Sequence, residues 1–273
     1  MREERTLISF DWALKSILRQ KDNFDILEGF LTDLIGEKIE IIDLLESESN
    51  QANKEDKFNR VDLKAKDSTE REIIIEIQYD SEPDYIGRVY YGTCKTALEN
   101  MKVGRRYADV KKVISVSIVY WQLLEKSYLV RGKMEFKDLE DNRAIELKKG
   151  QNIFAEYYFI QPEYFNDKIK HKIDEWVYMF KHSKVKGEVE ATNIDKVQDK
   201  LDRLNMTAEE QKVYEEYRLN KMINEGVLQN KFDEGEVKGK AEGIIEGIER
   251  ARAEMKAEGI ADEIIKKIID NIK

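Results

Sequence analysis

Two acids and an amide lie close together in one short stretch, RVDLKAKDSTEREIIIEIQ at residues 60–78. Glu76 interrupts a run of isoleucines, and Gln78 follows it by two residues. Side chains alternate between the two faces of a strand, so Glu76 and Gln78 lie opposite Ile75 and Ile77. The second half of the stretch therefore predicts a strand with one aliphatic and one polar face.

Asp62 lies on a preceding strand that alternates in the same way. A hairpin centred on Thr69 places Asp62 directly across from Glu76. The Cβ atoms of such a pair lie about 4.5 to 5.5 Å apart, and like charges at that distance repel. A divalent cation shared by both carboxylates, with the Ile77 carbonyl as a further ligand, reverses that penalty. The alternative is that both acids only line a solvated strand face.

The composition favours a hard metal ion at any such site. Cys94 is the single cysteine, which excludes an intramolecular disulfide and a cysteine-based zinc cluster. The chain has only two histidines, His171 and His182. Carboxylate oxygens are therefore the expected ligands, and they suit Mg²⁺ or Mn²⁺.

Hydrophobic periodicity predicts the elements that position these residues. The order of helices and strands indicates an α/β or α+β core. The aromatic side chains of Tyr91, Tyr107 and Trp121 are expected to pack in that core. The expected helices are 10–18, 24–35, 85–104 and 169–180, and the expected strands are 39–45, 60–66, 72–79, 113–121, 128–130, 133–136, 144–147 and 153–160.

The character of the chain changes after about residue 185, which predicts a catalytic domain at 1–185 and a charged helical tail at 186–273. Thr207 and Glu210 have the spacing of a helix-opening capping box. The tail then carries four glycines spaced four residues apart, at Gly235, Gly239, Gly243 and Gly247. Each costs about 1 kcal/mol in a helix, which favours a compensating partner surface and hence a homo-oligomer. A flexible charged extension is the alternative.

Charge is distributed unevenly. The net charge of −9 argues against a nucleic-acid partner, but residues 84–112 carry seven basic and three acidic side chains, a local +4. Residues 186–273 carry 16 basic and 21 acidic side chains, a balance of −5. No apolar run approaches the roughly 20 residues of a membrane span, and the charged N-terminus lacks a secretory pattern. We expect a cytoplasmic protein with no membrane partner.

The stretch VDLKAKDSTEREIIIEIQ resembles the Asp and Glu-x-Gln core of the PD-(D/E)xK nuclease superfamily, specifically its bacterial recombination-promoting nuclease and transposase family. The resemblance extends through FDWALKSILRQKDNFDILEGFL, YIGRVYYGTCKTALENMKVGRRYADVKKVISVSIVYW and the glycine-repeat tail. It implies a restriction-endonuclease-like core, a mixed β-sheet flanked by helices, followed by a C-terminal helical tail. It also implies Mg²⁺-dependent hydrolysis of DNA phosphodiesters, linked to recombination or mobile elements.

In this resemblance Asp62 and Glu76 match the metal-binding acids, and Gln78 stands where the wider superfamily has lysine. A glutamine amide donates and accepts hydrogen bonds, but it supplies no charge and cannot act as a base. Lys64, two residues after Asp62 on the same strand face, is a candidate for the missing cation. The alternative for Lys64 is a solvated strand lysine.

Further candidates come from the same resemblance. Asp11 and Lys15, one helical turn apart, match an N-terminal pattern and could reach the metal site, or form an ordinary surface ion pair. Arg88 matches a family arginine and is expected to bind phosphate, or to be a helix-surface charge. A basic cluster could follow a phosphate backbone or belong to a solvated loop; it contains Lys102, Arg105, Arg106, Lys111 and Lys112.

The leading interpretation is a metal-dependent DNA endonuclease. A catalytically inactive, nuclease-like scaffold whose tail recruits partners is the alternative that the Gln78 substitution keeps open. A nuclease acting on RNA is a third interpretation, because the sequence does not display the contacts that separate the two substrates.

Overall fold

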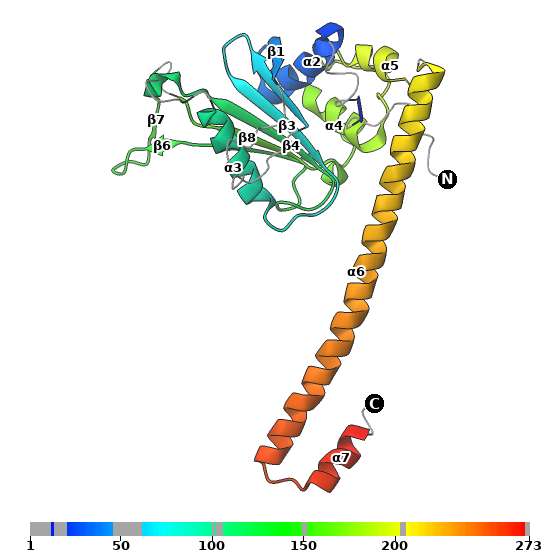
Figure 1. Ribbon diagram of the computed structural model, residues 1–273. Helices are drawn as coiled ribbons and strands as arrows, with labels where there is room; N and C mark the ends of the chain where they lie inside the picture. The colour runs from blue at the N-terminus through cyan, green and yellow to red at the C-terminus, as the bar shows by residue number, and fades with distance from the viewer. Residues whose placement is uncertain are drawn as a thin grey trace. The chain divides into compact units, whose positions relative to one another are not determined.

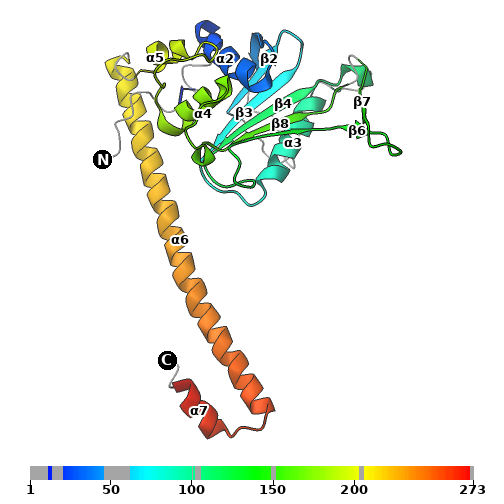
Figure 2. The same cartoon turned by 180° about the vertical axis from the view of Figure 1, so that it is seen from behind.

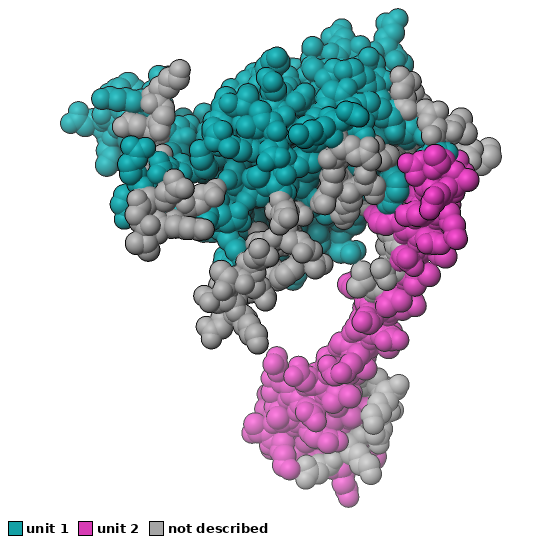
Figure 3. Space-filling view, turned by 45° about the horizontal axis from the view of Figure 1, so that its top comes forward, with its two compact units in different colours: residues 1–206 teal, residues 207–273 magenta. Residues whose placement is uncertain are grey.

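A computed structural model describes residues 12–13, 21–45, 62–99, 101, 106–148, 152–202 and 206–270. The chain divides into two compact units, Met1–Met206 and Thr207–Lys273, which Figure 3 colours separately. Within the described ranges, no helix combines the length and apolar character that a membrane crossing requires.

A six-stranded mixed sheet forms the centre of the first unit (Figures 1 and 2). The strand order is β1-β2-β3-β4-β8-β5, in which β3, β4 and β8 run parallel and the other neighbours are antiparallel. This sheet, with its flanking helices and a C-terminal helix, confirms the expected fold class. The strands are β1 (Ile41–Leu45), β2 (Leu63–Asp67), β3 (Glu72–Gln78), β4 (Val113–Val119), β5 (Leu129–Lys133) and β8 (Glu156–Ile160).

One face of the sheet is aliphatic and is covered by α2 (Phe24–Ile35) and α4 (Lys172–His182) (Figures 1 and 2). The ring of Phe30 from α2 lies 5.7 Å from that of Trp176 and 5.2 Å from that of Phe180, both in α4. Alternate isoleucines of β3, Ile73, Ile75 and Ile77, are buried. Period-two alternation in the sequence thus directs the aliphatic side chains of β3 to one side.

The opposite face is covered by α3 (Tyr85–Leu98) and is apolar over only part of its width (Figure 1). Its apolar part is a buried cluster of Tyr85, Val89, Val119 and Phe159, against which Trp121 packs. Its polar part lies over β2 and β3, where Lys64, Lys66, Glu72 and Glu76 share this face with the buried Ile74.

Two of the three expected core aromatics do not lie in the core. Trp121 is partly buried and packs edge-on against Tyr85, at a ring separation of 5.6 Å. Tyr107 is 90 % exposed and Tyr91 is 37 % exposed, so their placement in the core was wrong. Tyr107 begins a short 3-10 turn, η2 (Tyr107–Asp109), outside the helices and strands that enclose the core, and Tyr91 lies on a side of α3 turned away from the apolar cluster.

The second unit consists of a long helix, α6 (Ala208–Ala257), and a short one, α7 (Asp262–Asp270), which packs against it. The predicted capping box is confirmed, because Thr207 Oγ1 accepts from the Glu210 amide at 3.2 Å and Glu210 accepts from the Thr207 amide at 2.8 Å. Gly259 separates the helices with a positive φ of 80°, a backbone conformation that favours glycine. The remaining elements are η1 (Lys21–Asn23), β6 (Phe136–Lys137), β7 (Ala144–Ile145), η3 (Pro162–Tyr164) and α5 (Asp195–Leu201).

The first unit extends past residue 185 because the segment after α4 is fastened to α2. The Asp33 carboxylate of α2 accepts from the Trp176 indole N–H at 3.0 Å and from the Thr192 amide at 2.7 Å. Gly29, one turn earlier in α2, lies so close to this segment that an added Cβ would be 2.0 Å from the Thr192 carbonyl oxygen. A hydrogen-bonded carboxylate and a missing side chain together allow this close approach.

Replacing Gly29 with alanine should therefore lower the free energy of unfolding by about 3 kcal/mol, because backbone atoms must move to accept the methyl group. Gly87→Ala is the matched control, since a Cβ at that helical position meets nothing within 4 Å. Urea unfolding of both variants measures the difference. Equal stability of the two would contradict the close approach of α2 to Thr192.

Candidate active site

The β2–β3 hairpin has the register that the sequence predicted. Leu63 pairs with Ile75 and Lys64 with Ile74, which leaves Asp62, just before β2, across from Glu76. The Asp62 Oδ2 atom accepts a hydrogen bond of 2.7 Å from the Ile77 backbone N–H. Asp62 is therefore held at the end of the hairpin by the residue whose carbonyl was the expected third metal ligand.

Glu76 lies in a polar but poorly solvated space between the sheet and α3. Its side chain is 15 % exposed, and its neighbour on β4 is the buried Ser117. The pKa of Glu76 is raised from an ordinary 4.5 to about 7, mainly by burial; Arg88 opposes the shift, and the charges of Asp62 and Glu82 add to it. Burial, followed by the nearby Glu76, also raises the pKa of the Tyr85 hydroxyl.

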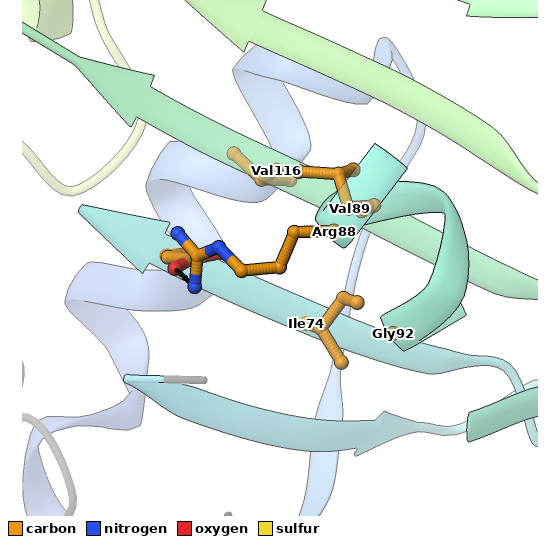
Figure 4. A pocket seen from close by; sticks show the side chains of 7 residues that line it. Ile74, Arg88, Val89, Gly92 and Val116 are labelled. Atoms are coloured by element: carbon orange, nitrogen blue, oxygen red, sulfur yellow. Dashed lines mark ion pairs between the residues drawn. The ribbon is translucent and has the colours of Figure 1, made fainter. Parts of the chain in front are cut away.

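Arg88, whose side chain Figure 4 shows, lies near the start of α3 and forms an ion pair with Glu76. Its Nη1 atom lies 2.5 Å from Glu76 Oε1, and its Nε atom lies 3.0 Å from Glu82 Oε2. Its guanidinium carbon lies 5.0 Å from the centre of the Tyr85 ring, a distance at which the ring face attracts a cation. The side chain lies with Ile74 and Val89 along a small pocket between α3 and the sheet (Figure 4).

Lys64 is buried, so its interpretation as a solvated strand lysine is wrong. The side chain is 6 % exposed, and its Nζ atom lies 3.1 Å from Glu72 and also pairs with Glu99. From its position opposite Ile74, the side chain extends toward Glu72. The cation that the structure places against Glu76 is Arg88.

Gln78 ends β3 on the same face as Glu76. Its amide donates a hydrogen bond of 3.1 Å to the backbone carbonyl of Asp80. The hydrogen bond fixes the orientation of the amide, which is compatible with a positioning role.

The remaining predicted residues are not brought to this site by the described part of the chain. Arg106 is 82 % exposed and pairs with Asp109 at 3.3 Å. Asp11, Lys15, Lys102 and Arg105 lie outside the described residues.

Sequence reasoning missed Glu82, Tyr85 and Ser117 as neighbours of Glu76. Ser117 carried a signal, since it interrupts an apolar strand as Glu76 does, on the adjacent strand. Glu82 and Tyr85 carried none, because their position depends on where α3 crosses the sheet.

The residues present fit a hard divalent ion with few protein ligands. Among described residues, no three His, Cys, Asp or Glu side chains come together as a metal-binding group. Mg²⁺, however, is commonly bound by one or two carboxylates, with waters completing its shell. Asp62 raises the pKa of Glu76, so the two carboxylates interact electrostatically as a shared site requires.

The raised pKa of Glu76 predicts a pH-dependent stability. Between pH 4.5 and about 7 Glu76 keeps its proton in the folded state but loses it in the unfolded state. The contribution of Glu76 to the free energy of unfolding is therefore greatest below this range and falls as the pH rises through it. Relative to Glu76→Gln, which does not titrate, the wild type should lose about 3 kcal/mol of unfolding free energy from pH 4.5 to pH 7.5. Urea unfolding of both proteins in EDTA at each pH measures this loss. A difference in unfolding free energy between the wild type and Glu76→Gln that does not change with pH would contradict the shifted pKa.

The family of the chain follows from comparison with known proteins. Searches of curated proteins and of solved structures return no match. A family model described as "PD-(D/E)XK nuclease family transposase" matches residues 8–228. This range includes every strand that the structure describes and ends within the first half of α6. The match spans well over half of the 273 residues. The chain therefore belongs to the PD-(D/E)XK nuclease family transposases.

Proposed function

We propose that this protein is a metal-dependent DNA endonuclease linked to recombination or mobile elements and acting in the cytoplasm. The observation that carries the proposal is the placement of Asp62 across from a largely buried Glu76 at one end of the β2–β3 hairpin. Asp62, Glu76 and the Ile77 carbonyl would hold Mg²⁺ or Mn²⁺, which when bound activates water and polarises the phosphate. Family membership supports the same chemistry.

The side chains around the two acids have separate tasks in this proposal. Gln78, fixed by its hydrogen bond to Asp80, orients water through its amide. Arg88 supplies the positive charge that the amide lacks and binds a phosphate oxygen, for which a guanidinium is well suited. Lys64 stabilises the sheet through its buried ion pairs with Glu72 and Glu99.

The basic side chains after α3 are proposed to contact the DNA backbone. Arg106 is exposed and Lys111 is partly exposed. Together with Lys102 and Arg105 they give this part of the chain a positive charge that its acidic tail lacks. Such contacts position DNA without reading its sequence.

Cleavage of supercoiled plasmid tests the proposal. The wild type should nick DNA with Mg²⁺ or Mn²⁺ but not with EDTA, and Asp62→Asn should reduce the rate at least about 100-fold, because removal of one metal-binding charge weakens transition-state stabilisation. Asp43→Asn, the same change at an exposed position on β1, should keep the wild-type rate.

Absence of cleavage by the wild type with either ion would contradict the enzyme and favour the scaffold. A parallel assay on single-stranded RNA distinguishes the substrates. Faster cleavage of RNA than of DNA would contradict a deoxyribonuclease.

We also propose that the second unit associates with a second copy of the chain. An apolar row along α6 follows the alternating four- and three-residue spacing of a coiled-coil seam. α7 packs on α6 with Ile265 and Ile269 buried. The row consists of Val237, Ala241, Ile244, Ile248, Ala251 and Met255.

The exposed part of this row is suited to a copy of itself. Val237 is 69 % and Ile244 is 63 % exposed, whereas Ile248 and Met255 nearer the end of α6 are partly buried. The row thus continues a surface that already accepts one amphipathic helix of this chain. Charges of both signs flank it, as in the Lys240–Glu236 pair, so two copies meet without net repulsion.

The glycine row offers a competing surface, and a pair of variants separates the two. Gly239 and Gly243 lie roughly a third of a turn or more around the axis from the seam, and an added Cβ meets nothing within 4 Å. Val237→Glu with Ile244→Glu should produce a monomer in light scattering, whereas Gly239→Ala with Gly243→Ala should preserve the oligomer and stabilise the helix by about 1 kcal/mol per site.

The opposite pattern, loss of association in the alanine variant alone, would assign the interface to the glycines. A monomeric wild type would contradict self-association altogether.

A further inference from the structure

Arg88 occupies the position where a cation bound to Glu76 is expected. In the part of the chain that the structure describes, it is the cation paired with this carboxylate, through Nη1 and Glu76 Oε1 at 2.5 Å. A second acid, Glu82, holds the other side of the guanidinium at 3.0 Å from Nε. The arrangement offsets part of the cost of a charged, mostly buried Glu76 without any metal.

A divalent ion and Arg88 compete for the same carboxylate. The guanidinium already takes one of the two oxygens that Glu76 offers a metal. An ion shared by Asp62 and Glu76 would also place two positive charges beside a third, and like charges at a few ångströms repel strongly in a partly buried site. Simultaneous binding of Arg88 and a divalent ion by the Glu76 carboxylate is therefore unfavourable.

The surroundings of Arg88 allow it to leave. Its side chain is 26 % exposed and that of Glu82 is 36 % exposed, whereas its Nε and Nη2 atoms are buried and make no hydrogen bond with a described residue, so little besides the two ion pairs holds the guanidinium in place. Its long aliphatic stem begins on α3, which keeps the side chain near the site after the head group moves. A freed guanidinium beside the two acids is well placed to bind an anionic oxygen.

We propose that Arg88 is an exchangeable counter-ion: it neutralises Glu76 in the metal-free protein, and a divalent ion displaces it so that it can bind a phosphate of the substrate. The inference rests on the proposed function, since it requires the ion to bind at Asp62 and Glu76. It adds that metal binding creates the phosphate-binding group, so that metal binding and DNA recognition reinforce one another.

Side-chain NMR of the full chain tests this exchange without measuring cleavage. The Glu76 carboxyl carbon reports metal binding, and the Arg88 Nε–H signal, identified by its loss in Arg88→Lys, reports the ion pair. On addition of Mg²⁺ both signals should change, and solvent exchange of the Arg88 Nε–H, which is buried in the metal-free protein, should become at least about tenfold faster as the guanidinium leaves its ion pairs for solvent. In Asp62→Asn, which loses a metal ligand but keeps both ion pairs, both signals should stay near their metal-free state.

The remaining outcomes separate this inference from the proposed function. A Glu76 carboxyl that responds to Mg²⁺ while the Arg88 Nε–H stays protected would overturn the exchange and leave the metal site intact. No response of either group up to saturating Mg²⁺ would overturn both.

Discussion

The burial of Glu76 beside Asp62 is the constraint on which the rest of the site depends. Burial and the neighbouring acid both disfavour the ionised carboxylate, and they raise its pKa to about 7. The aliphatic face of β3, packed against α2 and α4, fixes this arrangement. A one-residue slip of the strand would turn Glu76 into the aliphatic core and Ile75 and Ile77 toward α3. The packing of the β3 isoleucines against α2 and α4 thus keeps the Glu76 carboxylate on the opposite face of the sheet, where its charge is unfavourable.

Local periodicity was sufficient to predict this part of the structure. Alternation along β2 and β3, with a short turn between them, determined both the register and the pairing of Asp62 with Glu76. The partners of the charges depended instead on where α3 crosses the sheet. Lys64 therefore pairs with Glu72 and Glu99, and Arg88 approaches Glu76 from α3, the element that follows β3. The C-terminal limit of the first unit could not be predicted from local sequence patterns either, because hydrogen bonds between the distant residues Asp33 and Thr192 hold this segment to α2.

Gln78 supplies no positive charge at the position where the wider superfamily of this family has lysine. In the proposed function Arg88 supplies that charge. The amide is tied to the Asp80 carbonyl, so it offers direction but no charge. The guanidinium on α3 offers charge and belongs to a different element. In the proposed exchange, the division of these properties between Gln78 and Arg88 lets the positive group move while the amide stays in place.

The most direct measurement of the metal site is anomalous diffraction from a crystal of the protein soaked in Mn²⁺. We expect a single strong anomalous peak within coordination distance of the Asp62 and Glu76 carboxylates and the Ile77 carbonyl. Mn²⁺ bound only elsewhere, with the Asp62 and Glu76 side chains unchanged, would contradict the assignment of these two acids as the metal-binding pair.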